Sequence, residues 1–428
     1  MRRGRQVLTR VFDPVHRVYL ASPAWCKNAL RAAAPAGLRS LVREHLVPLL
    51  RGGASAPAGR HGVAVFGYLR SAFGLGEVAR ATVRSCQAAG IAVELGELPV
   101  ANKAVHLEPG LDPLFRQWPE QPVQIFCWTA ESALAAPAAL RRAAWPGKYR
   151  IGIWFWELAQ FPREWSGAFD EFDEIWATSP FIHETLAKVS PIPVVQMPLA
   201  VDFELTRPYT RADFDLPENK FLCLFSYDFD SYAQRKNPQA CIAAFRLAFP
   251  PGREDVALVI KTILGARHAQ QWQQLQDLAR GDPRVILRDV ALSRDQFYGL
   301  QSVCDVYLSL HRSEGFGFGM AEAMRLSKPV VATGYSGNRA FMTSSNSCLV
   351  DYRLVPVADG DYPNAAGQQW AEPDLGQAAQ YLRRLHAEPA WRARLGARAA
   401  AAIRERHSHV AVGRQIKRRL EQIRKLRA

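Results

Sequence analysis

Short apolar segments alternate with amphipathic segments along most of the chain. The first series of apolar segments comprises residues 63–69, 91–98, 123–129, 149–158, 174–179 and 193–198, and the second comprises 221–229, 257–263, 284–290, 305–310, 328–333 and 347–352. The segments are rich in β-branched and aromatic residues, and most are separated by stretches with apolar residues at helical spacing. This alternation predicts an α/β fold in which helices cover both faces of parallel sheets.

The two series predict two doubly wound, Rossmann-like domains that face a central cleft. The polar, proline-containing stretch AVDFELTRPYTRADFDLPENK separates them, and 428 residues are too many for one ordinary core. The expected parts are a basic extension and linker (1–61), an N-terminal Rossmann-like domain (62–205), a C-terminal Rossmann-like domain (206–390) and basic helices (391–428). Ligands of such folds bind at the carboxyl ends of the strands, here in the cleft.

Charge is distributed unevenly around a formal net charge of +14. Residues 1–60 contain 11 Lys and Arg against 2 Asp and Glu, and residues 391–428 contain 12 against 2, so the segment between them has a net charge of −5. Such ends suit an anionic membrane or a nucleic acid, although a charge run is usually a solvated helix face. We expect membrane-surface contact at the amphipathic N-terminal end, a solvated face at the C-terminal end, and no specific nucleic acid.

Neither a signal peptide nor a membrane-spanning helix is evident. Asp13, His16 and Arg17 interrupt the only early apolar stretch, and no later stretch reaches roughly 18 uninterrupted apolar residues. The seven cysteines never have CxxC spacing, which argues against a zinc site or a disulfide framework. We therefore expect a cytoplasmic protein, soluble or peripheral at the inner face of the plasma membrane.

The glycine pattern GLGEVA follows the first apolar segment and opens a helix. Gly74 and Gly76 would let the backbone amides of that helix approach a phosphate or a sugar, because glycine has no side chain in the way. A glycine turn between strand and helix is also common for steric reasons alone. The pattern by itself leaves both interpretations open.

Three cations occupy positions that suit a diphosphate. Arg235 and Lys236 follow the first strand of the second series and lead into a helix that begins near Pro238, although such a pair is often surface charge. Lys261 lies near the end of the apolar segment 257–263, where burial is costly unless the ammonium group meets an anion.

A metal site is not expected. Asp228 and Asp230 form the D-x-D spacing that clamps a divalent ion in some nucleotide-sugar enzymes, but the same tripeptide recurs at 213–215 and cations follow within a few positions. Histidines are few and lack ligand spacing, and no GxSxG nucleophile elbow occurs.

The stretch SEGFGFGMAEAM carries two carboxylates, Glu314 and Glu322, on either side of a glycine-rich turn. In one continuous helix they would stand roughly 12 Å apart and off a common face, too distant to act as an acid/base couple. The glycines instead predict a loop at Glu314 and a helix from about Phe318, with Glu322 near its first turn, where its charge suits the helix dipole. A simple glycine turn with a capping Glu is the alternative.

Together these residues resemble a known family. HRSEGFGFGMAEAMRLSKPVVATGYSGN is similar to the signature of retaining GT-B glycosyltransferases of family 4 (glycosyltransferase group 1), with Glu314 and Glu322 as its E-x7-E motif. RKNP and FGLGEVAR resemble that family's phosphate-binding segment and its N-domain glycine loop. The resemblance covers roughly residues 62 to 405 and is strongest in the second domain.

The resemblance implies transfer of a sugar from a nucleotide-diphosphate sugar to an acceptor hydroxyl with retained configuration and without a cofactor. Lys236 would bind the diphosphate, Glu314 would lie against the donor sugar, and Glu322 would accept hydrogen bonds from the ribose. The backbone of Gly315, Phe316 and Gly317 would face the donor. The implied setting is bacterial surface polysaccharide or lipopolysaccharide assembly, with a lipid-linked or polysaccharide acceptor.

The chain departs from the family pattern at two points. The family's frequent arginine at the end of the first strand of the second domain is missing, because this chain reads FSYDFD there, so Arg235 or Lys261 would supply the second cation. The N-domain histidine also lacks a match, and Trp156 and Glu157 lie in its place, as core or as acceptor-cleft residues. The alternatives are a GT-B-fold nucleotide-sugar isomerase and an inactive, basic membrane- or nucleic-acid-binding protein.

Overall fold

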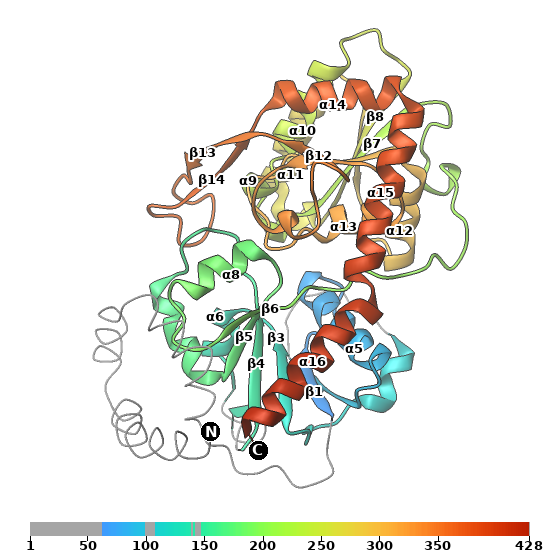
Figure 1. Cartoon of the computed structure of the whole chain (residues 1–428). Helices are drawn as coiled ribbons and strands as arrows, with labels where there is room; N and C mark the ends of the chain where they lie inside the picture. The colour runs from blue at the N-terminus through green and yellow to red at the C-terminus, as the bar shows by residue number, and fades with distance from the viewer. Residues whose placement is uncertain (1–61, 99–107, 138–139, 142–146, 428) are drawn as a thin grey trace.

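The computed structural model describes residues 62–98, 108–137, 140–141 and 147–427. The expected basic extension and linker (1–61), with its membrane-surface contact, therefore lies outside the described residues. The described part contains two six-stranded parallel sheets, one below the other in Figure 1, with helices packed around each. This is the α/β architecture of two doubly wound halves that the alternating pattern predicts.

The N-terminal sheet has the strand order β2-β1-β3-β4-β5-β6, and all of its strand pairs are parallel. Its strands are β1 (Val63–Gly67), β2 (Val93–Glu97), β3 (Val123–Cys127), β4 (Tyr149–Trp154), β5 (Glu174–Ala177) and β6 (Val194–Gln196). The intervening α-helices are α5 (Gly74–Ala88), α6 (Ala130–Leu134) and α8 (Pro180–Ala187). Every strand falls within an apolar segment of the first series, because burial on both faces requires a nearly continuous apolar run.

The C-terminal sheet has the order β12-β11-β10-β7-β8-β9, again with parallel pairs throughout. Its strands are β7 (Phe221–Asp228), β8 (Val256–Ile263), β9 (Val285–Asp289), β10 (Val306–Ser309), β11 (Val330–Thr333) and β12 (Cys348–Val350). Its α-helices are α9 (Ala233–Lys236), α10 (Pro238–Ala248), α11 (Ala269–Ala279), α12 (Arg294–Val303), α13 (Phe318–Arg325) and α14 (Leu375–Ala387). The expected helix start at Phe318 is confirmed.

An antiparallel hairpin that the sequence pattern did not predict joins β12 to α14. It consists of β13 (Tyr352–Pro356) and β14 (Gln369–Pro373). The Gln368 side chain, at the end of the connecting loop, donates to the Gln160 carbonyl (2.7 Å) and accepts from the Gln160 amide (3.1 Å). The hairpin therefore ties the C-terminal half to the N-terminal half. Short 3-10 helices complete the fold, at Pro109–Leu114, Arg163–Glu171, Ala212–Phe214, Phe229–Ser231, Gly265–His268 and, as η7, Ser336–Ala340.

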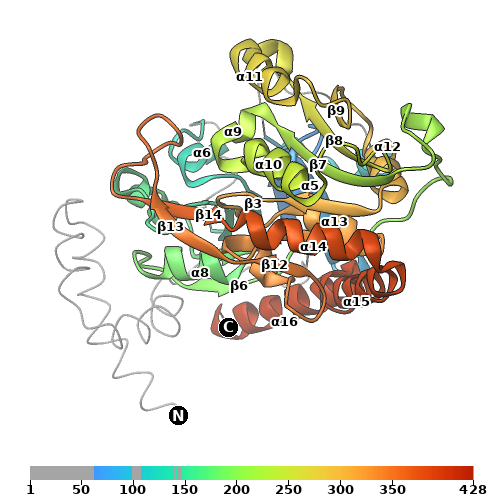
Figure 2. The same ribbon diagram turned by 90° about the horizontal axis from the view of Figure 1, so that it is seen from above.

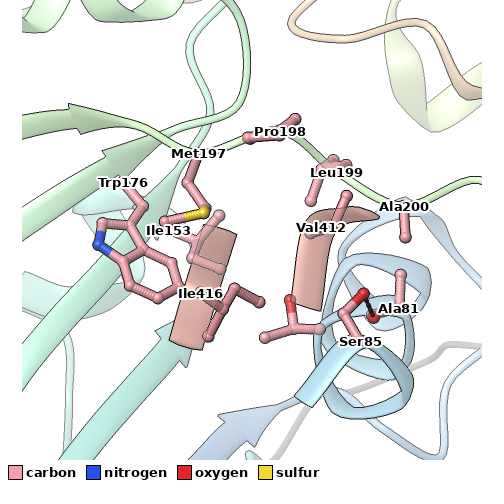
Figure 3. A pocket seen from close by; sticks show the side chains of 11 residues that line it. Ala81, Ser85, Ile153, Trp176, Met197, Pro198, Leu199, Ala200, Val412 and Ile416 are labelled. Carbon is pink, nitrogen blue, oxygen red and sulfur yellow. Dashed lines mark hydrogen bonds between the residues drawn. The ribbon is translucent and has the colours of Figure 1, made fainter. Parts of the chain in front are cut away.

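The last two helices return the chain to its first half. Helix α15 (Pro389–His407) packs against α13 and α14, and α16 (His409–Arg427) packs against α5. Both run along one side of the molecule (Figures 1 and 2). Helices α5 and α16 approach each other closely at Gly413, because an added Cβ there would overlap the carbonyl oxygen of Ser85 in α5. Figure 3 shows the contact surface, where Val412 and Ile416 of α16 face Trp176 and Met197 around a void of about 10 Å³.

A buried ion pair fixes α16 to the N-terminal sheet. The Glu174 carboxylate on β5 is fully buried and accepts hydrogen bonds from Arg419 of α16. It also accepts from the Tyr149 hydroxyl (3.0 Å) and the Trp176 indole (2.7 Å). A carboxylate buried with several donors is stable in its charged form, and losing one partner is costly.

The apolar face of α16 is buried, and most of its basic residues are exposed on the opposite side. This is the solvated arrangement expected for the C-terminal end. Among the described residues, no helix is both long and apolar enough to cross a membrane.

We predict that Gly413→Ala lowers the free energy of unfolding by about 1–3 kcal/mol, because the added methyl group meets a backbone oxygen that cannot rotate away. The gain in helix propensity of up to about 1 kcal/mol offsets only part of this cost. Urea denaturation measures the difference. The control is Gly167→Ala, whose nearest neighbour would be a side-chain carbon at 3.6 Å. Equal stability of the two variants would contradict the close α5–α16 contact.

Candidate active site

Loops at the carboxyl ends of strands from both sheets meet at one place. The Ser179 hydroxyl, just after β5, donates to the Gly315 carbonyl in the loop after β10 (2.9 Å). The Ser313 hydroxyl donates to the Glu157 carbonyl in the loop after β4. The cleft between the halves is therefore closed around the glycine-rich turn at this point, at the strand ends where ligands of α/β folds bind.

Glu314 and the Arg-Lys pair converge here although they are 78 and 79 positions apart. One carboxylate oxygen of Glu314 lies 3.1 Å from the Arg235 guanidinium, and the other lies 2.5 Å from the Lys236 ammonium. Arg235 is only 5 % exposed and Glu314 only 8 %. The structure thus brings together three of the residues that the sequence proposed for catalysis and donor binding.

The charge balance of this cluster determines how its groups ionise. Burial alone would raise the pKa of Glu314, but Lys236 and Arg235 override it and lower the pKa to about 2. Burial lowers the pKa of Lys236, which its contact with Glu314 only partly restores. Glu314 is therefore a fixed anion and an unsuitable proton carrier near neutral pH.

The loop that carries Glu314 is positioned by one side-chain and one backbone hydrogen bond from η7. The Glu314 amide donates to the Ser336 hydroxyl (2.8 Å), and the Gly337 amide donates to the Glu314 carbonyl (2.8 Å). A Cβ at Gly337 would overlap the Gly315 carbonyl, so only glycine allows this approach. Gly337 belongs to the GYSGN end of the long signature, but the sequence did not show this role.

Each residue of the glycine-rich turn has a different structural role. Gly317 has a φ of 97° and is the N-cap of α13, a conformation that favours glycine. Phe316 is buried and packs against Phe341 with ring centroids 5.0 Å apart, so its side chain anchors the turn. Gly315 lies against the N-terminal half, where an added Cβ would be 3.1 Å from Phe155.

Glu322, the second carboxylate, belongs to a separate inter-domain cluster. It is 1 % exposed and accepts a hydrogen bond from Arg294, the first residue of α12. Arg294 also donates to the Tyr298 hydroxyl (2.8 Å) and lies 3.9 Å from the Glu77 carboxylate in α5. Burial raises the pKa of Glu322, and Arg294 counteracts it. Sequence reasoning missed both partners, because Arg294 lies in no recognisable pattern and Glu77, although part of GLGEVA, acquires its role only from Arg294, which is far away in the sequence.

Lys261 lies near this second cluster and not at Glu314. It is 8 % exposed on β8, opposite Ser226 of β7, with its ammonium 5.5 Å from the centre of the Phe297 ring. Burial lowers its pKa to about 8, although Asp228 and Asp289 act in the opposite direction. Among the described residues, Lys261 has no direct ion pair. It is a buried cation suited to an anionic ligand.

The two glycines of the first loop differ in their surroundings. A Cβ at Gly74 would meet no atom within 4 Å, whereas a Cβ at Gly76 would overlap the carbonyl oxygens of Tyr68 and Ser71. The buried Arg80 donates to the Ser71 carbonyl (3.0 Å) and holds the loop over the start of α5. Gly76 therefore has a packing function, and Gly74 leaves open space at the helix start.

The hairpin contributes Tyr362 to the site, a residue that sequence reasoning did not identify. Its hydroxyl donates to the Glu157 carboxylate (2.6 Å), and its ring lies 5.7 Å from that of Trp156. Trp156 is 4 % exposed and packs edge-on against Trp165, so of the two interpretations of this residue the structure supports core packing. Glu157 remains at the cleft, beside the turn at Gly315.

The D-x-D carboxylates are engaged elsewhere. Asp228 caps a 3-10 turn by accepting from the Asp230 amide (2.8 Å), and Asp230 pairs with His268 (2.8 Å). Asp213 of the second tripeptide accepts from Arg207 (2.8 Å). In the part of the chain that the structure describes, no group of three or more His, Cys, Asp or Glu is arranged to hold a metal ion.

Several solved structures superpose on most of this chain. Sucrose-phosphate synthase from Thermosynechococcus elongatus superposes with a TM-score of 0.62 over 85 % of this chain and 99 % of its own, at 18 % identity. HepE of Anabaena, solved with UDP and glucose, gives 0.59 over 85 % and 100 % at 15 % identity. A glycosyltransferase from Rickettsia africae gives 0.59 over 85 % and 99 % at 13 % identity. The fold is GT-B.

Similarity detected from the sequence alone covers a smaller part of the chain. Residues 228–362 match the family model of glycosyl transferases group 1, which is less than half of the chain. This segment contains the Arg-Lys pair, Lys261, both carboxylates and the glycine-rich turn. No curated protein matches the chain. The GT-B fold and the matched segment agree with the expected architecture and with a glycosyl-transferring family in the C-terminal half.

We predict that Glu314→Ala lowers the free energy of unfolding by about 3 kcal/mol, because it leaves the buried Arg235 and the partly buried Lys236 without their counter-ion. Urea denaturation measures this loss. The control is Asp277→Ala, which removes one partner of an exposed pair with Arg280 and should cost under about 1 kcal/mol. If both variants lost the same small amount, the cluster at Glu314 would not be a buried ionic contact.

Proposed function

We propose that this protein is a retaining glycosyltransferase that moves a sugar from a nucleotide-diphosphate sugar to an acceptor hydroxyl. The observation that carries the proposal is the convergence of Arg235, Lys236 and Glu314 at the glycine-rich turn, between the two halves of a GT-B fold. The match of residues 228–362 to glycosyl transferases group 1 supports it. HepE, a structural neighbour, has been solved with UDP-glucose.

The cations supply the main electrostatic contribution to this chemistry. In glycosyl transfer the bond from the anomeric carbon to the diphosphate breaks, and both electrons go to the leaving oxygen. Lys236 and Arg235 would stabilise the negative charge that develops there, which is the largest catalytic effect available to preorganised charges. They are paired with Glu314 in the ligand-free protein, so a diphosphate would share cations that are already in place.

The anionic Glu314 would stabilise the positive charge that develops on the sugar ring. The acceptor oxygen bonds to the anomeric carbon on the face that the diphosphate leaves, and the acceptor proton passes to an oxygen of the leaving phosphate. The products are the glycosylated acceptor and a nucleoside diphosphate, with no general base required from the protein. This assignment agrees with the low pKa of Glu314, which makes it a poor proton acceptor.

Residues outside the Glu314 cluster would make the remaining contacts with the donor. Glu322, together with Arg294, would bind the ribose, and Lys261 would supply a further cation for the diphosphate in place of the family arginine that FSYDFD lacks. Gly74 offers the open backbone approach from the N-terminal half. We propose neither a metal nor another cofactor.

The acceptor and setting rest on sequence resemblance. We propose a lipid-linked or polysaccharide acceptor in bacterial surface polysaccharide or lipopolysaccharide assembly, at the cytoplasmic face of the membrane. The acceptor would enter beside Glu157 and Tyr362, where the loop after β4 meets the hairpin.

We predict that one class among UDP-, GDP- and ADP-sugars raises the melting temperature and is hydrolysed slowly, with or without chelator. Lys236→Ala should lower kcat by about 10²–10³, because one preorganised cation is lost. Glu322→Ala should chiefly raise KM, because ribose binding is equal in the ground and transition states.

Turnover by coupled nucleoside-diphosphate release checks both effects, with the surface variant Lys220→Ala as the control. Absence of any donor preference, or unchanged activity in Lys236→Ala and Glu322→Ala, would overturn the proposal. Chelator-sensitive turnover that is lost in Asp228→Ala would instead indicate a metal-dependent enzyme.

The low pKa of Lys261 predicts a pH dependence of nucleotide binding. A diphosphate binds the charged ammonium, so its affinity should fall as the pH rises through about 8, by about tenfold per pH unit at most. Titration calorimetry between about pH 7 and pH 9 measures this decline. In Lys261→Met the affinity should be lower and independent of pH. A decline that persists in this variant would assign the titration to another group.

A further inference from the structure

A second hollow lies at the joint between α15 and α16. This groove has a volume of about 720 Å³ and is lined by the carboxyl ends of β5 and β6, by η7 and by the first turns of α16. It is lined by none of the residues assigned above to the donor or the acceptor. The groove touches both halves of the fold and α16, but it is a separate site because it shares no lining residue with the cluster at Glu314.

The lining of the groove is strongly basic. Arg406, Arg414 and Arg418 contribute three guanidinium groups, and Glu405 contributes the one carboxylate. All three arginines are exposed, and none makes an ion pair with another described residue. Arg414 and Arg418 are four residues apart on one face of α16, where like charges repel unless an anion lies between them.

A buried hydroxyl in the same groove has no partner within the part of the chain that the structure describes. Thr178, which follows β5, is 2 % exposed, and its side-chain oxygen forms no hydrogen bond with any described residue. A buried hydroxyl without a partner costs free energy, which a ligand that accepts its hydrogen bond would recover. The amide side chains of Gln196 and Gln415 also line the groove and add further donors.

We propose that this groove binds a phosphate group, carried either by a soluble phosphate ester or by a lipid headgroup. Guanidinium groups form paired hydrogen bonds with phosphate oxygens, and hydroxyl and amide donors complete such a site. Arginines of a merely solvated helix face need no hollow and no buried donor beside them. The proposal is independent of the sugar-transfer activity, since it uses none of the donor-site residues.

Binding here would connect three parts of the molecule. Thr178 and Gln196 belong to the N-terminal sheet, η7 belongs to the C-terminal half, and Arg414 and Arg418 belong to α16. Thr178 immediately precedes Ser179, which contacts the glycine-rich turn, and η7 holds the Glu314 loop. A phosphate in the groove would therefore brace the contact between the halves through residues adjacent to those that hold the turn.

The test compares Arg414→Gln/Arg418→Gln with a matched pair, Arg394→Gln/Arg398→Gln. The control arginines have the same four-residue spacing on α15, are exposed, and do not line the groove. Binding of inorganic phosphate and of glycerol 3-phosphate is measured by thermal shift at constant ionic strength. Flotation with phosphatidylcholine vesicles, with and without phosphatidylglycerol, tests the lipid headgroup.

The groove pair should lose at least tenfold in apparent phosphate affinity, whereas the control pair should match the wild type. Phosphate bound at Lys236 contributes equally to all of these proteins and does not affect the comparison. If the Arg414/Arg418 variant loses flotation and the control variant does not, the ligand is a lipid headgroup. If the Arg414/Arg418 variant loses binding of the soluble phosphates but keeps flotation, the ligand is a phosphate ester. Equal binding by both pairs, or an equal loss in both, would overturn the proposal.

Thr178→Val gives a second, nearly isosteric test. It should weaken phosphate binding severalfold without lowering the melting temperature, because the hydroxyl donates to no other described residue. A lower melting temperature with unchanged phosphate binding would contradict the role of Thr178. Release of nucleoside diphosphate from a donor sugar should be unchanged in the Arg414/Arg418 variant, so failure of the proposed enzyme activity and failure of the groove are distinguishable.

Discussion

The structure around the cleft depends on one constraint, which is that buried charge must be neutralised within the protein. Arg235 is buried and Lys236 is partly buried after the carboxyl end of β7, and the Glu314 carboxylate compensates both charges. This requirement fixes the path of the loop after β10, the placement of η7 against it, and the contact of the turn with Ser179. The charged groups of this cluster are thus already held in place by the protein, which would reduce the reorganisation that binding of an anion requires.

The same principle operates between the halves. Arg294 lies between Glu322 of one half and Glu77 of the other, and Glu174 holds Arg419 of the returning helix. These contacts are buried or partly buried, where ionic interactions are strong but costly to break. The relative placement of the two halves is consequently set by charge as well as by the apolar packing of α16 on α5.

Much of this fold could be predicted from the sequence, because parallel strands buried on both faces produce apolar runs that are visible without a structure. The start of α13 followed from the glycines of the turn. The family resemblance implied that Lys236 and Glu314 serve one donor site, but their direct ion pair, across 78 positions, was not predicted. Arg294, Glu77 and Tyr362 could not be identified, since each acquires its role from a partner far away in the sequence. The hairpin was missed because β13 is mostly exposed and β14, although partly buried, is too short and polar to form an apolar run.

The packing of α16 on α5 has a consequence for the order in which the molecule can form. The contact joins segments that are 324 positions apart at Ser85 and His409, so the N-terminal half lacks one of its covering helices until almost all of the described chain has been synthesised. The C-terminal sheet and its helices up to α14 are available earlier. During translation the N-terminal half is therefore synthesised first but completed last. Until α16 packs on it, the apolar surface of α5 that α16 covers remains exposed.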